Sequence, residues 1–159
     1  MMDPQKLRLL IQAVLSPLGS GLYSLNAEEL LMATCANESN LGLYRSQEKG
    51  GPGKGIFQIE TSDFDDIWAN YLAYKPVLGC LVKANNYSNQ GTSQDLVMND
   101  RYSIAMARIH YARCPGALPD SKDLDGIWAY YKQYYNTPEG AAVEGIFKYK
   151  YQKYVLGQP

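Results

Sequence analysis

Residues 36–60 read ANESNLGLYRSQEKGGPGKGIFQIE, and this stretch decides how the chain is interpreted. Its first residues end a helical pattern, because apolar residues precede them at helical spacing and glycine follows them. Its middle is rich in glycine and charged residues, which predicts a loop. The carboxylate of Glu38 is therefore expected where a helix runs out into a glycine-rich loop. A fold can present a general acid to a long polymer from such a position.

Helical patterns recur on both sides of this loop. The predicted helices cover about residues 4–15, 26–38, 62–72, 99–113, 121–135 and 137–156, with Asn26 expected to cap the second and Thr137-Pro138-Glu139 to open the last. Residues 56–60 are short, β-prone and partly apolar, which fits one arm of a small hairpin. Residues 85–95 are polar and predict a surface connection. The sequence thus predicts a mainly α (α+β) fold, a single domain over residues 1–159 with a small β-hairpin or irregular segment near residues 50–60.

The composition is that of one ordinary globular domain. The 159 residues are 46% hydrophobic and 12% aromatic, which suffices for one core. Fifteen basic and sixteen acidic residues leave a formal charge of -1, so no long-range field draws the molecule to nucleic acid or anionic lipid. No apolar run approaches the roughly 20 residues that cross a bilayer. We therefore expect no nucleic-acid partner and no membrane span.

The cysteine and histidine pattern predicts neither a metal ion nor a cofactor. Cys35, Cys80 and Cys114 are odd in number, widely spaced and without a CxxC pair, so free and mostly buried thiols are expected. The only histidine, His110, lies inside a predicted helix between Ile109 and Tyr111 and is expected to be structural. The glycine-rich run at 50–55 lacks the spacing of a phosphate loop. The expected cofactor is none, and so is the expected metal.

Glu38 is the candidate for acid catalysis. Cleavage of a glycosidic bond requires a proton donor for the leaving oxygen, and apolar surroundings raise the pKa of a carboxylic acid enough to supply it. Leu41, Phe57 and Ile59 are expected to contribute an apolar wall, and Ser39 and Gln58 are expected to hydrogen-bond a sugar. Taken alone, a glutamate at a helix end is more commonly a solvent-exposed acid, so the pattern around it decides.

Three segments in order resemble the soluble lytic transglycosylase and goose-type lysozyme branch of the lysozyme-like superfamily. The first is Glu38-Ser39 at a helix end, followed by a glycine-rich loop and GIFQI at 55–59, where the family usually has Glu-Ser and then Gly-Leu-Met-Gln-Ile. The second is RYSIAMARI at 101–109, which resembles the family's helix behind the groove. The third is YNTPEGA at 135–141, which resembles its Ala-Tyr-Asn-Ala-Gly-Pro-Gly-Ala segment. The resemblance spans about residues 27–142.

This resemblance implies cleavage of peptidoglycan glycan strands at the β-1,4 bond between N-acetylmuramic acid and N-acetylglucosamine, by a lytic transglycosylase or a lysozyme. It makes Glu38 the catalytic general acid and base, and Tyr135 the residue that orients it, with Tyr130 and Tyr131 as rivals. The substrate-binding residues that it implies are Ser39, Phe57, Gln58, Ile59, Tyr135 and Asn136. Glu60 is the candidate second acid, although one glutamate can suffice in this branch because the sugar's own acetamido or 6-hydroxyl group takes the second role.

The chain departs from the family pattern at Phe57, which replaces a methionine, and at Thr137-Pro138, which replace small residues. The N-terminus has an acid and a proline where a signal peptide needs a basic stretch. Together with the tyrosine-rich tail, this resembles phage proteins. The expected setting is a virion, with other tail or ejection proteins as partners, or the host cytoplasm before release of an endolysin, with action in the periplasm or cell wall. A non-catalytic structural virion or glycan-binding protein on the same fold is the alternative, and action on N-acetylglucosamine polymers ranks third.

Overall fold

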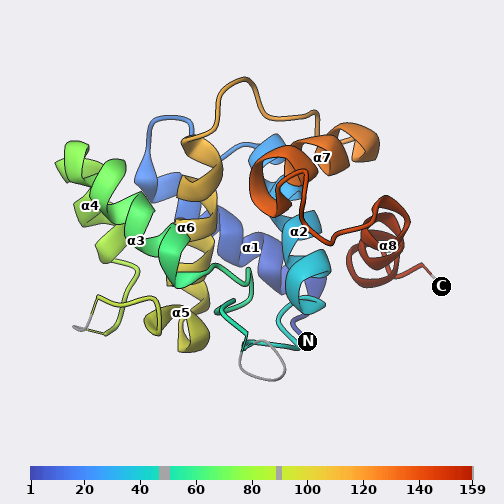
Figure 1. Cartoon of the computed structure of the whole chain (residues 1–159), viewed down its shortest axis with the longest axis horizontal. Coiled ribbons are helices and arrows are strands. Elements are labelled where there is room, and N and C mark those ends of the chain that lie inside the picture. The colour runs from blue at the N-terminus through green and yellow to red at the C-terminus, as the bar shows by residue number, and fades with distance from the viewer. Residues whose placement is uncertain (47–50, 89–90, 159) are drawn as a thin grey trace.

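A computed structural model describes residues 1–46, 51–88 and 91–158 and is mainly helical, as predicted (Figure 1). Its helices are α1 (Pro4–Leu15), α2 (Leu25–Ser39), α3 (Thr61–Asn70), α4 (Pro76–Lys83), α5 (Asp95–Met98), α6 (Asp100–Ala112), α7 (Leu124–Tyr131) and α8 (Glu144–Lys150). Short 3-10 turns follow α1 (Ser16–Leu18) and α3 (Leu72–Tyr74). π-helical turns extend α7 (Lys132–Asn136) and α8 (Tyr151–Val155).

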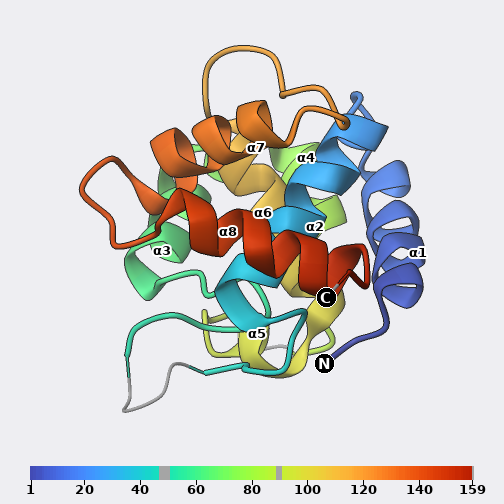
Figure 2. The same ribbon diagram turned by 90° about the vertical axis from the view of Figure 1, so that its right-hand side faces the viewer.

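Helix α2 is the central element of this fold. Its residues from Ala27 to Ala36 are buried on every face of the helix, which is expected of a helix surrounded by other helices. Helices α1, α6, α7 and α8 all pack against it, and α8 crosses in front of it in Figure 2. The C-terminal end of α2, which carries Glu38, is therefore held from several sides.

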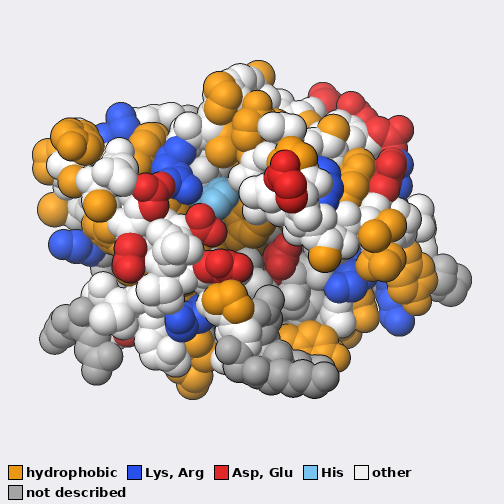
Figure 3. Space-filling view, in the orientation of Figure 1, with side chains coloured by type: hydrophobic (Ala, Val, Ile, Leu, Met, Phe, Trp, Pro, Cys, Tyr) orange, Lys and Arg blue, Asp and Glu red, His pale blue; other side chains and the backbone are white. Residues whose placement is uncertain are grey.

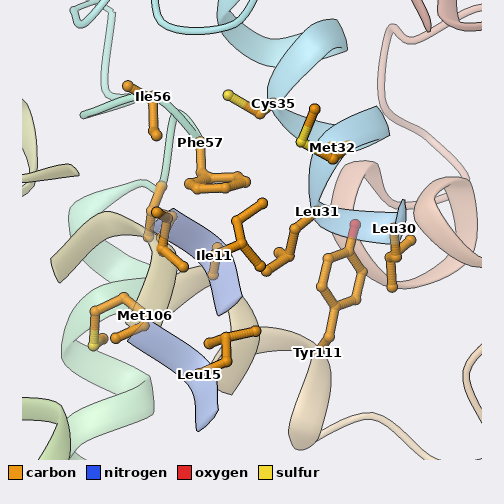
Figure 4. Close-up of a cluster of buried hydrophobic side chains, with 14 of the residues drawn as sticks. Ile11, Leu15, Leu30, Leu31, Met32, Cys35, Ile56, Phe57, Met106 and Tyr111 are labelled. Atoms are coloured by element: carbon orange, nitrogen blue, oxygen red, sulfur yellow. The ribbon is translucent and has the colours of Figure 1, made fainter. Parts of the chain in front are cut away.

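The hydrophobic core lies mainly between α1, α2 and α6 (Figure 4). Ile11 of α1, Leu31 of α2 and Met106 of α6 are fully buried there. Phe57 comes from the loop before α3 and points into the same cluster, with none of its side chain exposed. Burial of one such side chain contributes about 1.5–3 kcal/mol to folding. The loop that follows α2 is therefore anchored by the core.

Side-chain caps fix where the helices begin. Asp3 accepts a hydrogen bond from the Lys6 amide at 2.9 Å ahead of α1, and Asn99 accepts one from the Tyr102 amide at 3.1 Å ahead of α6. The predicted cap of α2 is wrong, because Ser24 rather than Asn26 is its N-cap and accepts from the Ala27 amide at 3.1 Å. The Asn26 side chain instead accepts a hydrogen bond from the Ser121 amide at 2.9 Å.

The last two helices begin later than predicted. Helix α7 starts at Leu124, where Asp123 caps it, and not near residue 121. Thr137-Pro138-Glu139 does not open the last helix, because Thr137 has a positive φ of 66° and α8 begins only at Glu144. The Asn136 side chain accepts from the Ala142 amide at 3.2 Å, which closes the intervening turn.

The segment near residues 50–60 takes the irregular form rather than a hairpin. Lys54 makes isolated antiparallel bridges with Ser46 and Ile59, and the described residues contain no longer strand. Residue 50 and part of the predicted 85–95 connection, residues 89–90, lie outside the described residues. Helices α4 and α5 were not predicted.

The three cysteines differ in their burial. All three thiols are free, as expected, but only Cys35 is buried, whereas Cys114 is half-buried and Cys80 is exposed.

Within residues 1–46, 51–88 and 91–158, no helix combines the length and the apolar character that crossing a membrane requires.

Candidate active site

Glu38 lies in the last turn of α2 and lines a polar pocket of about 170 Å³. The hollowed face of the molecule in Figure 3 has the histidine at its centre and acidic side chains around it. The pocket joins the end of α2 to the loop before α3, the start of α3, α6 and the end of α7. Its other lining residues are Gln58, Ile59, Glu60, Asp63, His110, Tyr135 and Asn136.

The end of α2 is fixed by backbone conformation and by the Ser39 hydroxyl. Asn40, Leu41 and Gly42 have positive φ angles of 50°, 54° and 76°, which turn the chain away from the helix axis. The Ser39 hydroxyl donates to the Ile56 carbonyl oxygen at 2.6 Å and accepts from the Gly42 amide at 2.8 Å. Ser39 is only 1% exposed, so its predicted contact with a sugar is wrong. It ties the end of α2 to the loop that carries Gln58.

The Glu38 carboxyl is half-enclosed by hydrogen-bond donors. The Tyr131 hydroxyl donates to Glu38 Oε1 at 2.5 Å, and Asn37 Nδ2 approaches the same oxygen at 3.5 Å while donating to the Tyr131 hydroxyl at 2.8 Å. Burial raises the pKa of Glu38 above its ordinary value of 4.5 and outweighs these hydrogen bonds and the charge of Lys150, which lower it. Lys150 Nζ donates to the Asn37 carbonyl oxygen at 2.7 Å, so α8 also supports this end of α2.

Tyr131, and not Tyr135, orients Glu38. The Tyr135 hydroxyl donates to the Phe57 carbonyl oxygen at 2.8 Å, and its ring lies 4.6 Å from the His110 ring and 5.9 Å from the Tyr131 ring, centroid to centroid. The expectation that Tyr135 orients Glu38 is therefore wrong, although Tyr135 does line the pocket. The two tyrosines are four residues apart and share one face of the helix, so only their tertiary partners distinguish them.

The loop at 55–59 divides its side chains between the core and the pocket. Phe57 is fully buried in the core, so its predicted place among the substrate-binding residues is wrong. Gln58 lines the pocket with a positive φ of 51°, and its Nε2 donates to the Gly55 carbonyl oxygen at 2.8 Å. A left-handed conformation costs a non-glycine residue free energy and is concentrated at functional sites. Ile59 is 2% exposed and contributes an apolar part of the wall.

Two acids and a histidine complete the pocket. Glu60, the candidate second acid, is exposed and lines it, and so does Asp63 in the first turn of α3. His110 was predicted to be structural, yet it also lines the pocket, and its Nε2 lies 3.1 Å from the Tyr134 carbonyl oxygen. Burial lowers the pKa of His110, which favours the neutral imidazole. Its place directly after the 101–109 segment was the signal that could have assigned it to the pocket.

Asn136, which was expected to bind the substrate, lines the pocket, but its side-chain oxygen already accepts two hydrogen bonds. It accepts from Lys132 Nζ at 2.8 Å as well as from the Ala142 amide.

In the part of the chain that the structure describes, no group of three or more His, Cys, Asp or Glu side chains is placed to hold a metal ion. Comparisons with protein-family models, with curated proteins and with solved structures found no match to this chain.

Proposed function

We propose that this chain cleaves peptidoglycan glycan strands and that Glu38 is its general acid. The observation that carries the proposal is the Glu38 carboxyl at the edge of a polar pocket, with its pKa raised by burial and one oxygen held by Tyr131. Cleavage of a glycosidic bond needs an acid that is still protonated close to neutral pH. The resemblance of residues 27–142 to the lytic transglycosylase and goose-type lysozyme branch supplies the substrate class, the β-1,4 bond between N-acetylmuramic acid and N-acetylglucosamine.

In the proposed reaction Glu38 gives its proton to the leaving glycosidic oxygen as the bond to the sugar carbon breaks. The Tyr131 hydroxyl then stabilises the carboxylate that forms, because it already donates to Oε1. Glu38 next takes a proton from the nucleophile, which is either water or the 6-hydroxyl of the same sugar. Water gives a reducing end and hence a lysozyme, whereas the 6-hydroxyl gives a 1,6-anhydro sugar and hence a lytic transglycosylase.

Glu60 and Asp63 line the same pocket and are the groups available to position a water molecule. If one of them does so, the products carry reducing ends and the substitution Glu60→Gln or Asp63→Asn lowers the yield. If the sugar supplies the nucleophile, both variants retain the formation of anhydro products. Fragment masses distinguish the two cases, because the anhydro product lacks one water.

The decisive experiment is the digestion of purified sacculi followed by mass analysis of the soluble fragments. We expect the wild type to release muropeptides and Glu38→Gln to release them about 100-fold to 10,000-fold more slowly. Glu139→Gln is the matched control, because Glu139 is exposed and does not line the pocket. Circular dichroism and thermal unfolding verify that each variant folds. Undiminished release by Glu38→Gln would reject the assignment.

Binding without turnover would favour the alternative, a structural virion or glycan-binding protein. In that case the wild type would sediment with sacculi and release no fragments. The setting that we propose for either function is a phage, in which the protein is part of the virion with other tail or ejection proteins, or acts as an endolysin. Detection of the chain in purified virions supports the first setting, and its presence only in the lysing host supports the second.

A further inference from the structure

A second cavity, of about 600 Å³, lies apart from the Glu38 pocket. The chain after α1, helix α4, the end of α6, the loop after α6 and helix α7 form its walls. Among the described residues, none lines both cavities. Most of the wall is apolar, and this part includes Leu18, Leu22, Val77, Leu78, Leu81 and Leu118. This volume is typical of a small-molecule site.

Helix α6 separates the two cavities. Arg108 and Ala112 are one helical turn apart and line the second cavity, while His110 lines the Glu38 pocket. Two residues along an α-helix turn through about 200°, so Arg108 and His110 project to nearly opposite sides of α6. A ligand in the second cavity therefore does not occupy the pocket proposed for the sugar.

The second cavity contains a buried positive charge without a counter-ion. Arg108 is 7% exposed, and its Nε donates to the Leu22 carbonyl oxygen at 2.7 Å. Within the described residues, no carboxylate pairs with Arg108, and its Nη1 is buried without a hydrogen-bond partner. The Tyr130 hydroxyl, which belongs to the same cavity, is likewise buried and unpartnered. An uncompensated buried charge is costly, and an anion would offset that cost.

The charges around the cavity have one sign. Arg108 and Lys75 both line it, and none of its described lining residues is Asp or Glu, although acids slightly outnumber bases in the whole chain. Burial lowers the pKa of Arg108. The ordinary pKa of a guanidinium is so far above 7 that Arg108 remains charged at neutral pH. The cavity is thus lined mostly by apolar residues and carries positive charge at Arg108 and Lys75.

We propose that this cavity binds a small organic carboxylate with an apolar body. The carboxylate accepts hydrogen bonds from the Arg108 guanidinium and the Tyr130 hydroxyl, and the body packs against the leucines of α4 and of the chain after α1. A guanidinium matches a carboxylate in shape and charge. The enclosed position of Arg108 favours a small molecule over a protein segment. This proposal is independent of the activity proposed for Glu38.

The test is calorimetric titration of the whole chain with decanoate and with decanol, both below the concentration at which decanoate forms micelles. Decanol has the same chain without the charge. We expect decanoate to bind at least about 10-fold more tightly than decanol, because a charged carboxylate forms a stronger hydrogen bond with a guanidinium than an uncharged hydroxyl does. Equal affinities for the two compounds, or no binding of decanoate, would overturn the proposal.

Two variants locate the site. Arg108→Met keeps much of the side-chain volume and removes the charge, so the preference for decanoate over decanol should be lost, whereas Arg101→Met on the same helix should keep it. Ala112→Leu leaves Arg108 in place and fills part of the cavity, and it should weaken decanoate at least about 10-fold by steric exclusion. Unchanged decanoate binding in either Arg108→Met or Ala112→Leu contradicts the assignment. If the cavity binds a peptide through its free C-terminal carboxylate but does not bind decanoate, the ligand is a protein partner and the proposal of a small molecule is wrong.

Discussion

The ionisation of Glu38 links the proposed chemistry to folding stability. Its pKa in the folded protein is raised above the ordinary 4.5, so between these two values the native state binds more protons than the unfolded state. The stability from this group is complete below pH 4.5 and is lost as the pH rises through the folded pKa. We therefore expect the wild type to lose unfolding free energy relative to Glu38→Gln as the pH rises from about 4.5, because glutamine does not ionise.

Urea unfolding of both proteins at a series of pH values measures this difference. Subtraction of the variant cancels the other titrating groups, including His110 and Asp66, whose pKa values are both lowered. A difference that stays constant across the series would mean that the Glu38 pKa is not raised.

Tyr131 should set the alkaline limb of the activity profile. Its hydrogen bond favours the Glu38 carboxylate and so lowers the Glu38 pKa, in opposition to burial. In Tyr131→Phe, Glu38 should keep its proton to higher pH. The alkaline limb of the pH profile of sacculus cleavage should therefore shift to higher pH. Tyr135→Phe is the matched control, since the Tyr135 hydroxyl bonds to the Phe57 carbonyl oxygen and not to Glu38. A purely structural Tyr131 would lower the rate without moving the limb.

The sequence placed Glu38, Gln58 and Asn136 together but misplaced Ser39, Phe57 and the tyrosine that holds Glu38. The position of Glu38 followed from the helix pattern and the glycine-rich loop, which are local signals. Ser39 and Phe57 were misplaced because their direction depends on the turn after α2 and on the core, and both are set by tertiary packing. Which of Tyr131 and Tyr135 hydrogen-bonds Glu38 depends on how α2 packs against α7. Such contacts join residues about 90 positions apart and leave no local pattern.

The loop before α3 passes close to both α5 and α6 at Gly55. This residue has a φ of +72°, and a Cβ there would lie 2.4 Å from the Leu96 carbonyl oxygen and from Ser103 Oγ. Gly55→Ala should therefore cost about 2–4 kcal/mol through strain and steric overlap, and it should shift Gln58 and lower activity. Gly21→Ala is the control, because Gly21 has a similar φ of +68° and no atom within 4 Å of its Cβ.

Denaturant unfolding compares the two glycine variants directly. Gly21→Ala should lose only about 1–2 kcal/mol, the cost of the left-handed backbone for a residue with a Cβ. Equal losses in the two variants would show that the close approach of Gly55 to α5 and α6 does not contribute.

Strong caps and regular apolar spacing made α1 and α6 predictable, whereas α4 was missed for a physical reason. Its sequence starts with Pro76 and contains Gly79, and both residue types usually interrupt a helix. Gly79 is instead buried, where even a Cβ would be in van der Waals contact with the Trp68 ring at 3.6 Å. Val82 is fully buried on the same helix. Packing thus overrides the local preference, and packing could not be read from a single sequence.

Across the whole molecule, one buried polar cluster joins the first, central and last helices. Arg8 of α1 donates to Glu28 at 3.0 Å and to both oxygens of Glu29 at 2.6 and 2.9 Å, which are residues of α2. The Tyr151 hydroxyl, from the turn that extends α8, donates to Glu29, and the Tyr23 hydroxyl donates to Glu28 at 2.9 Å. The cluster fixes α8 against α2, and α8 in turn carries Lys150 to the helix end beside Glu38.

Arg8→Met should therefore act at a distance as well as locally. It leaves two adjacent carboxylates in α2 without their cation, and we expect a loss of about 3 kcal/mol, at the low end for buried pairs because the Arg8 side chain remains 24% exposed. Denaturant unfolding measures the loss, and Arg101→Met provides a control without this cluster. Because Tyr151 shares Glu29 with Arg8, the double variant with Tyr151→Phe should lose less than the sum of the single losses. Strictly additive losses would mean that α1 and α8 are held to α2 independently, and the Glu38 end of α2 would then not depend on Arg8.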